Sequence, residues 1–220
     1  RLIAAGALLT VPDDISDEVA AASLAKGITA WYLIRRTVPI KAGDQILYHA
    51  AAGGVGTILC QWAKHLGAHV IGTVSSEDKK QRALRNGCDV VINYSEENFA
   101  DRVMDITRGE GVEVCYDSVA SDTFELSMKT VAPFGHIVLF GNASGDVDPE
   151  SYARIPLDRY FIHPTLPQYL ANTRERDGAV RELFEVIAKG VVKIDIPQKY
   201  PLEEAAQAQS NLESRRTVGS

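Results

Sequence analysis

The sequence predicts an α/β fold built on a doubly wound parallel sheet. Short apolar runs alternate with helix-length amphipathic segments between residues 45 and 140, at intervals that demand parallel crossovers. The chain has 220 residues, 45% of them hydrophobic, which is enough to bury a substantial core. Because the ligand crevice of such a sheet lies at the carboxyl ends of its strands, functional residues are expected there.

The first 40 residues are expected to lead into the sheet. Leu8–Val11 predicts a short strand, and a turn follows it at Pro12-Asp13-Asp14. Apolar residues then recur at helical spacing from Asp17 to Arg36, but Lys26-Gly27 interrupts them. Glycine is a poor helix former, so two helices joined by a kink or a tight corner are expected.

Five strands and four helices are expected between residues 45 and 140. The strands are Gln45–Ala50, His69–Val74, Val90–Asn93, Val112–Asp117 and His136–Phe140. The helices are Val55–Leu66, Glu77–Asn86, Asn98–Thr107 and Asp122–Val131. Gly67 and Gly87 stand where helix C-terminal caps belong, and Ser76 and Ser95 where N-terminal caps belong.

The last third of the chain gives fewer signals. Tyr160–Ile162 is apolar enough for a further strand, and a helix is expected from near Arg174 to Gly190. Val192–Ile196 is a candidate strand and Leu202–Arg215 a final helix.

The stretch Gln45–Gly56 carries the first functional signal. An apolar strand ends in a small-residue turn, with Ala51, Gly53 and Gly56 at the offsets of the Rossmann dinucleotide fingerprint. The helix after it would direct its free N–H groups and positive dipole end at a phosphate. A glycine-rich turn after a strand is also common as plain structure, so the turn alone leaves both interpretations open.

The end of the second predicted strand indicates which dinucleotide would bind. This position normally carries an acid that takes the ribose hydroxyls, but here Ser75 and Ser76 follow Val74, with Lys79 one turn later. Without the acid, nothing repels a 2′-phosphate, and two hydroxyls and a lysine can bind one. NADPH is therefore expected in preference to NADH. Alternatively, the serines only cap the helix and Lys79 is a solvated surface lysine.

Other predicted strand ends carry weaker signals. Tyr94 can stack on adenine or simply cover the sheet edge. Ser118 and Gly141 follow the fourth and fifth strands and can reach the ribose and the nicotinamide. His49 lies within an apolar strand and is expected to be a packed core or interface histidine. No hydrolytic triad and no metal-binding cluster is expected from the spacing of the histidines and acids.

Composition excludes several classes of partner. The net charge of −6 argues against nucleic acid and against an anionic membrane. Cys60, Cys88 and Cys115 are odd in number and far apart, so neither a disulfide framework nor a zinc site is indicated, and a cytoplasmic setting is expected. No apolar run approaches the roughly 20 residues that span a bilayer. The chain begins without Met, as expected for part of a longer protein.

Several motifs in one order resemble a known family. They are Lys26–Leu33, His49–Gly56, Val91–Tyr94, Tyr116–Val119 and Phe140–Asn142. Over residues 8 to 215 the chain is similar to the NADPH:quinone oxidoreductases, the zeta-crystallin-like, zinc-free branch of the medium-chain dehydrogenases/reductases. Ala51, at the first fingerprint position, matches the variant that this family uses.

The resemblance implies a site for NADPH but names no catalytic side chain and no metal ligand. It implies the following cofactor-binding residues: Tyr32, Gly53, Gly54, Val55, Ser75, Ser76, Lys79, Tyr94, Ser118, Phe140, Gly141, Asn142, Ala143 and Arg215. It also suggests contributions from Pro164–Leu166.

The resemblance further implies that an N-terminal catalytic β lobe is missing. Residues 1–40 would lead from that lobe, residues 41–166 would form the dinucleotide-binding core, and residues 167–220 would return toward the lobe. The quinone pocket would be completed by the missing lobe, so this part alone is expected to bind NADPH but turn over little. A homodimer through an edge strand is also implied, with Tyr160–Ile162 as the candidate strand.

Two alternatives to a quinone reductase remain open. One is an NADPH-dependent enone or enoyl reductase of the same superfamily, because the cofactor half barely distinguishes acceptors. The other is a non-catalytic nucleotide-binding or structural module.

Overall fold

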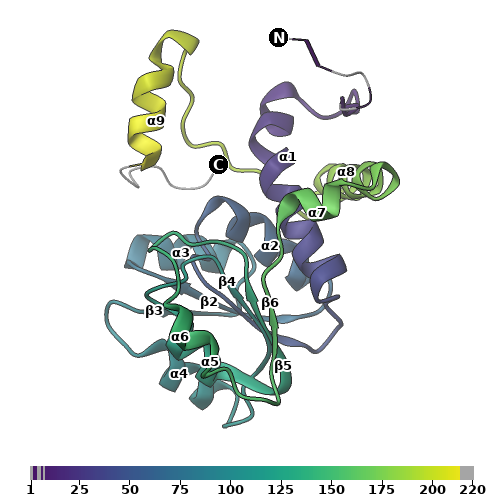
Figure 1. The fold of residues 1–220 in the computed structure, drawn as a ribbon. Helices are drawn as coiled ribbons and strands as arrows, with labels where there is room; N and C mark the ends of the chain where they lie inside the picture. Colours follow the sequence, from purple (N-terminus) through teal and green to yellow (C-terminus); the bar gives the residue numbers. More distant parts are fainter. Residues whose placement is uncertain (1, 4–5, 7, 214–220) are drawn as a thin grey trace.

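The computed structural model describes residues 2–3, 6 and 8–213, and its centre is a six-stranded parallel sheet (Figure 1). The strand order is β3-β2-β1-β4-β5-β6. The bounds are β1 Gln45–Tyr48, β2 His69–Val74, β3 Val90–Asn93, β4 Val112–Asp117, β5 Val131–Leu139 and β6 Tyr160–Ile162. The chain winds outward from β1 to β3, then returns to place β4 beside β1. This order confirms the predicted doubly wound sheet and puts its switch point between β1 and β4.

Helices cover both faces of the sheet. The α-helices are α1 Asp17–Tyr32, α2 Gly54–His65, α3 Glu77–Arg85, α4 Phe99–Ile106, α5 Phe124–Thr130, α6 Pro149–Tyr152, α7 Leu166–Leu170, α8 Thr173–Ala188 and α9 Ala205–Glu213. Buried residues of α1, α2, α3 and α8 share one core with the sheet, and those of α4 and α5 share another. Alternate residues of β1 divide between them: Ile46 and Tyr48 belong to the first core, and Leu47 to the second.

Local signals in the sequence explain many of the boundaries. Gly67 and Gly87 have φ values of 91° and 93°, the left-handed conformation expected after a helix. Ser76 accepts a hydrogen bond from the backbone N–H of Lys79 and caps α3, as predicted. The predicted cap Ser95 is wrong, because Asn98 caps α4 and Ser95 lies in the preceding turn. The predicted strand Tyr160–Ile162 is confirmed as β6, at one edge of the sheet.

The predicted break at Lys26-Gly27 is wrong. α1 is one continuous helix from Asp17 to Tyr32, and a π-helical turn, Leu33–Thr37, follows it. Gly27 is glycine because α8 packs against it: a Cβ there would lie 2.5 Å from Leu183 Cδ2 and 3.0 Å from Leu183 Cγ. The residue accommodates a neighbouring helix rather than ending its own.

Two further predicted strands are absent from the described residues. Leu8–Val11 pairs with no strand and runs as an extended segment over α8. Val192 is buried in the core beside α8, but Val192–Ile196 forms no strand ladder. β5 is longer than predicted, beginning at Val131 rather than at His136. The final predicted helix begins with a 3-10 turn, Leu202–Glu204, and continues as α9, which stands away from the sheet in Figure 1.

Candidate functional site

A tight turn follows β1 at the switch point of the sheet. Ala50 has a positive φ of 58°, and the N–H of Ala51 donates to the carbonyl oxygen of Thr73 on β2 at 3.1 Å. A Cβ on Gly56 would lie 2.7 Å from the oxygen of Ala51 and 2.8 Å from that of Ala50, so glycine is needed for α2 to begin this close to the turn. Gly53, the N-cap, supplies no side chain to the N–H groups of the first turn. Those groups can therefore bind an anion.

Lys26 reaches this turn from α1. A Cβ on Gly54 would lie 2.8 Å from both Cδ and Cε of Lys26 and 3.2 Å from its Nζ, so the lysine side chain lies directly on Gly54. Partial burial lowers the pKa of Lys26. The sequence interpretation missed this contact. The available signal was Gly54 itself, which is a glycine outside the three fingerprint positions.

Ser75, Ser76 and Lys79 gather at the end of β2. The Lys79 ammonium donates to Ser75 Oγ at 3.1 Å. Ser95 Oγ donates to the carbonyl oxygen of Ser75 at 3.2 Å, which fixes the loop after β3 beside this group. Ser76 thus acts as the helix cap, whereas Lys79 turns back toward the strand end. Tyr94 follows β3, leaves 45% of its surface exposed and donates its N–H to the carbonyl oxygen of Val74.

A cavity of about 600 Å³ opens at the ends of β4 and β5. Its lining includes Tyr32, Ala120, the loop from Phe140 to Asn142 and the segment from Pro164 to Leu166. The loops after β4 and β5 approach closely, because a Cβ on Gly141 would lie 3.0 Å from the carbonyl oxygen of Ser118. The N–H of Ala143 donates to the same oxygen at 3.1 Å.

Tyr32 forms one wall of this cavity. Its ring stacks on Tyr169, with centroids 4.5 Å apart and an interplanar angle of 9°. Burial, together with the neighbouring Tyr169, raises the pKa of Tyr32 to about 12. The phenol is therefore neutral at physiological pH and its O–H can serve as a donor. Thr29, one turn earlier on α1, lines the same cavity, although the sequence interpretation did not place it in the site.

The predicted site residues thus fall into three groups at the carboxyl edge of the sheet. Gly53, Gly54 and Val55 form the turn and the start of α2, and Ser75, Ser76, Lys79 and Tyr94 follow β2 and β3. Tyr32 and Phe140–Asn142 line the cavity, beside Ser118 and Ala143. Arg215 lies outside the described residues.

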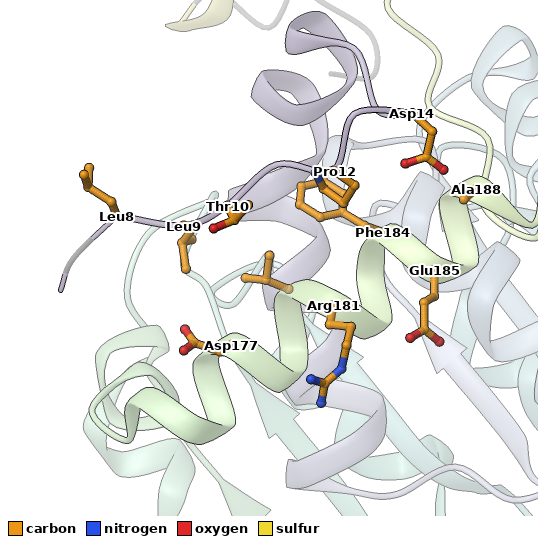
Figure 2. A pocket seen from close by; sticks show the side chains of 11 residues that line it. Leu8, Leu9, Thr10, Pro12, Asp14, Asp177, Arg181, Phe184, Glu185 and Ala188 are labelled. Carbon is orange, nitrogen blue, oxygen red and sulfur yellow. The ribbon is translucent and has the colours of Figure 1, made fainter. Parts of the chain in front are cut away.

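A second cavity, of about 500 Å³, lies elsewhere on the molecule. Figure 2 shows the segment from Leu8 to Asp14 running across α8, from which Arg181 and Glu185 project. None of its lining residues belongs to the loops at the strand ends. It is separate from the candidate site.

Metal-binding and membrane-spanning features are absent from the part of the chain that the structure describes. Within residues 2–3, 6 and 8–213, no group of three or more His, Cys, Asp or Glu side chains could hold a metal ion. Cys60, Cys88 and Cys115 are buried, free thiols. Over the same residues, no helix combines the length and the apolar character that crossing a bilayer requires.

Comparison with known proteins places this geometry in a family. Residues 54–165 match the family model described as zinc-binding dehydrogenase. The quinone oxidoreductase of Pseudomonas aeruginosa is 44% identical over 222 residues, which cover all of this chain and 68% of that protein. The chain belongs to the quinone oxidoreductase family. It spans about two thirds of the length of the relatives it matches, for example 65% of the Salmonella typhimurium quinone oxidoreductase.

Solved structures of quinone oxidoreductases share the fold. The Escherichia coli quinone oxidoreductase complexed with NADPH has a TM-score of 0.90 and 47% identity, over 96% of this chain and 66% of that one. A relative with another activity, the 2-haloacrylate reductase of Burkholderia sp, is 42% identical over all of this chain and 68% of its own length.

Proposed function

We propose that this chain is the NADPH-binding part of a quinone oxidoreductase that reduces quinones with NADPH. The observation that carries the proposal is the end of β2, where Lys79 donates to Ser75 and no acid occupies the position that would repel a 2′-phosphate. A phosphate there could accept from the Lys79 ammonium and from the hydroxyl of Ser75. The related Escherichia coli quinone oxidoreductase was solved in complex with NADPH, which agrees with this arrangement.

The remaining groups would hold the rest of the cofactor. The pyrophosphate would face the first turn of α2, at Gly54 and Val55, with the ammonium of Lys26 beside it. The nicotinamide end would lie toward the cavity between Tyr32 and the loop from Phe140 to Ala143. Tyr94 would cover the adenine, and Arg215, which lies outside the described residues, is a further proposed contact of the cofactor.

NADPH supplies the hydride when bound, and the chain supplies position and shelter from water. Tyr32 and its stacked partner Tyr169 form a wall that limits how the ring of the cofactor can sit. The close approach of Gly141 to Ser118 leaves no room for a side chain between the two loops. No residue of this chain is proposed as a proton donor.

Titration of NADPH and NADH into the 220-residue chain tests the proposal. NADPH should bind more tightly than NADH. Lys79→Ala should weaken the affinity for NADPH by roughly 10- to 100-fold, which corresponds to the loss of a charge-assisted hydrogen bond, and should leave the affinity for NADH unchanged. Lys80→Ala is the matched control, since Lys80 lies on the same helix but pairs with Glu77. Equal affinities for the two cofactors in the unsubstituted chain would refute the preference for NADPH.

The organisation of the whole enzyme is part of the proposal. Residues 1–40 would lead from an N-terminal catalytic lobe, residues 41–166 would form the cofactor core and residues 167–220 would return to the lobe. The quinone pocket would be completed by that lobe, so the chain alone should oxidise NADPH slowly. A cytoplasmic enzyme is proposed, because its cysteines are free thiols.

The proposed homodimer would pair through the sheet edge at β6. Tyr160 on this strand leaves 55% of its surface exposed, and an uncovered apolar edge otherwise invites aggregation. Light scattering of the chain should give twice the monomer mass, and a monomeric mass would count against this arrangement.

An enone or enoyl reductase is the second candidate. The specific support is the 42% identity to a 2-haloacrylate reductase, because a 2-haloacrylate is an activated alkene. A panel of quinones and activated alkenes, assayed with the full-length protein, separates the two. A non-catalytic nucleotide-binding module is the candidate of another class, and failure of the chain to bind either cofactor would favour it.

A further inference from the structure

A buried polar network joins three strand ends beneath the candidate site. His49, immediately after β1, is fully buried. Its Nδ1 lies 2.8 Å from Oγ1 of Thr73 on β2, and its Nε2 lies 2.9 Å from Oγ of Ser127 on α5. Ser127 Oγ lies 3.1 Å from Oδ2 of Asp117, the fully buried last residue of β4. One imidazole thus links β1, β2 and β4.

The acceptors around Ser127 indicate which nitrogen of His49 carries the proton. Ser127 Oγ also contacts the Cys115 thiol, and two further neighbours, the Asp117 carboxylate and the carbonyl oxygen of Thr123, can only accept. The Ser127 hydroxyl therefore donates to these two acceptors as a shared hydrogen bond, and it accepts from the Nε2–H of His49. Nδ1 is then unprotonated and accepts from the hydroxyl of Thr73. Burial lowers the pKa of His49, against the opposing charge of Asp117, which fits a neutral ring.

Each member of the network controls a different part of the site. His49 precedes Ala50, whose positive φ starts the turn before α2. Thr73 lies two residues before Ser75, and its carbonyl oxygen accepts from the turn at Ala51. Asp117 Oδ1 accepts from the N–H groups of Val119 at 2.8 Å and Ala120 at 3.0 Å.

Asp117 therefore shapes the loop that borders the cavity. Ala120 has a φ of 76°, a conformation that is strained for a residue other than glycine, and it lines the cavity beside Phe140. The two hydrogen bonds to Asp117 hold that conformation. Because Ser127 connects Asp117 to His49, the loop after β4 is held in fixed relation to the turn after β1.

We propose that His49 is a positioning residue that holds the ribose-phosphate end and the nicotinamide end of the site at the separation a bound dinucleotide requires. It is fully buried, so it acts on the cofactor only through Thr73 and through Ser127 with Asp117. This inference rests on the proposed function. It gives a role to His49, which is not among the residues proposed to contact the cofactor.

Two substitutions separate the two hydrogen-bonded arms of the network, which are the contact of His49 with Thr73 and the contact of His49 with Ser127. His49→Asn places an amide atom near the position of Nδ1 and can keep the Thr73 contact while losing Ser127. His49→Gln places one near Nε2 and can keep Ser127 while losing Thr73. The probes are adenosine 2′,5′-bisphosphate, which occupies only the adenosine end, and NADPH, whose reduced nicotinamide fluoresces.

His49→Asn should change the Kd for adenosine 2′,5′-bisphosphate by less than about twofold relative to the unsubstituted chain. The same substitution should weaken the affinity for NADPH about tenfold and shift the fluorescence emission of the bound nicotinamide. His49→Gln should instead weaken the affinity for adenosine 2′,5′-bisphosphate about fivefold. Ser127→Ala breaks the link to Asp117 with a smaller disturbance and should reproduce the pattern of His49→Asn, which keeps the test decisive if His49→Asn does not fold.

Ile137→Val controls for stability, because Ile137 is buried in the core beneath the same strands and belongs to no hydrogen-bonded arm. It should lower the melting temperature without changing either Kd. Variants of His49 and Ser127 that behave like Ile137→Val would overturn the positioning role. If the unsubstituted chain binds adenosine 2′,5′-bisphosphate and NADPH but the variants lack the predicted pattern, the positioning role of His49 falls and the proposed function stands. If the unsubstituted chain binds neither ligand, the proposed function and the positioning role both fall.

Discussion

Gly27 provides a direct test of how α1 is placed against α8. A free helix gains about 1 kcal/mol when glycine is replaced by alanine. In this fold the new Cβ of Gly27→Ala would lie 2.5 Å from Leu183 Cδ2, and overpacking of that kind costs roughly 1–3 kcal/mol. The substitution should therefore lower the free energy of unfolding by about 1 kcal/mol, the overlap outweighing the gain in helix propensity.

Truncating Leu183 should reverse the sign of the effect that Gly27→Ala has on the free energy of unfolding. Leu183 is fully buried, so Leu183→Ala alone should cost roughly 2–5 kcal/mol. In that background the Cβ at residue 27 meets open space, and Gly27→Ala should stabilise the chain by about 1 kcal/mol. The double-mutant cycle, measured by urea denaturation followed by circular dichroism, should thus give a coupling energy of about 2 kcal/mol.

Gly178→Ala calibrates the cycle. Gly178 lies within α8, and a Cβ there would meet nothing closer than Arg181 Nη2 at 4.0 Å. It should show the full propensity gain of about 1 kcal/mol. If Gly27→Ala stabilises the chain as much as Gly178→Ala does, Gly27 does not accommodate α8 and the reasoning is refuted.

Three further predictions concern the turn and the buried histidine. Gly56→Ala should destabilise the chain by roughly 1–3 kcal/mol, because its Cβ meets backbone oxygens, whereas Gly54→Ala meets only the flexible Lys26 side chain and should cost less; urea midpoints compare them. Lys26→Met should weaken the affinity for NADPH roughly tenfold in a fluorescence titration, and an unchanged Kd would exclude Lys26 from the proposed pyrophosphate site. Because the folded state lowers the pKa of His49, the unfolded chain binds more protons and the free energy of unfolding should fall as pH drops below about 6.5. Urea midpoints between pH 7.5 and 5.5 measure that slope, and His49→Gln should reduce it; burial also lowers the pKa of His136, so His136→Gln is measured in parallel.

The sheet could be predicted from the sequence because parallel strands covered on both faces are apolar along their length. His69–Val74, Val90–Asn93 and Val112–Asp117 were predicted with the bounds that the structure has. Short apolar runs fail as strand signals where no partner strand is available. Leu8–Val11 and Val192–Ile196 have the composition of strands, but within the described residues neither pairs with a strand.

Residues that depend on distant neighbours could not be assigned from the sequence. Gly27 has the local signature of a helix break, and only the approach of Leu183, far along the chain, explains it. His49 was correctly expected to be buried, but hydrophobic periodicity does not reveal that its two nitrogens meet Thr73 and Ser127. The position of strand-end residues such as Ser75 at one edge of the sheet was easier to predict, because in a doubly wound sheet chain order alone brings strand ends together.

Electrostatics connects two features of the turn that the motif leaves unexplained. A cation near a helix N-terminus is unfavourable because it faces the positive end of the helix dipole. Lys26 nevertheless lies on the first residue of α2, and no acceptor among the described residues pairs with it. Gly54 makes room for that placement at a position where the dinucleotide fingerprint does not require glycine. An anion at the turn would compensate both the dipole and the ammonium, so relief of this unfavourable arrangement would add to the binding free energy of a pyrophosphate in the proposed site.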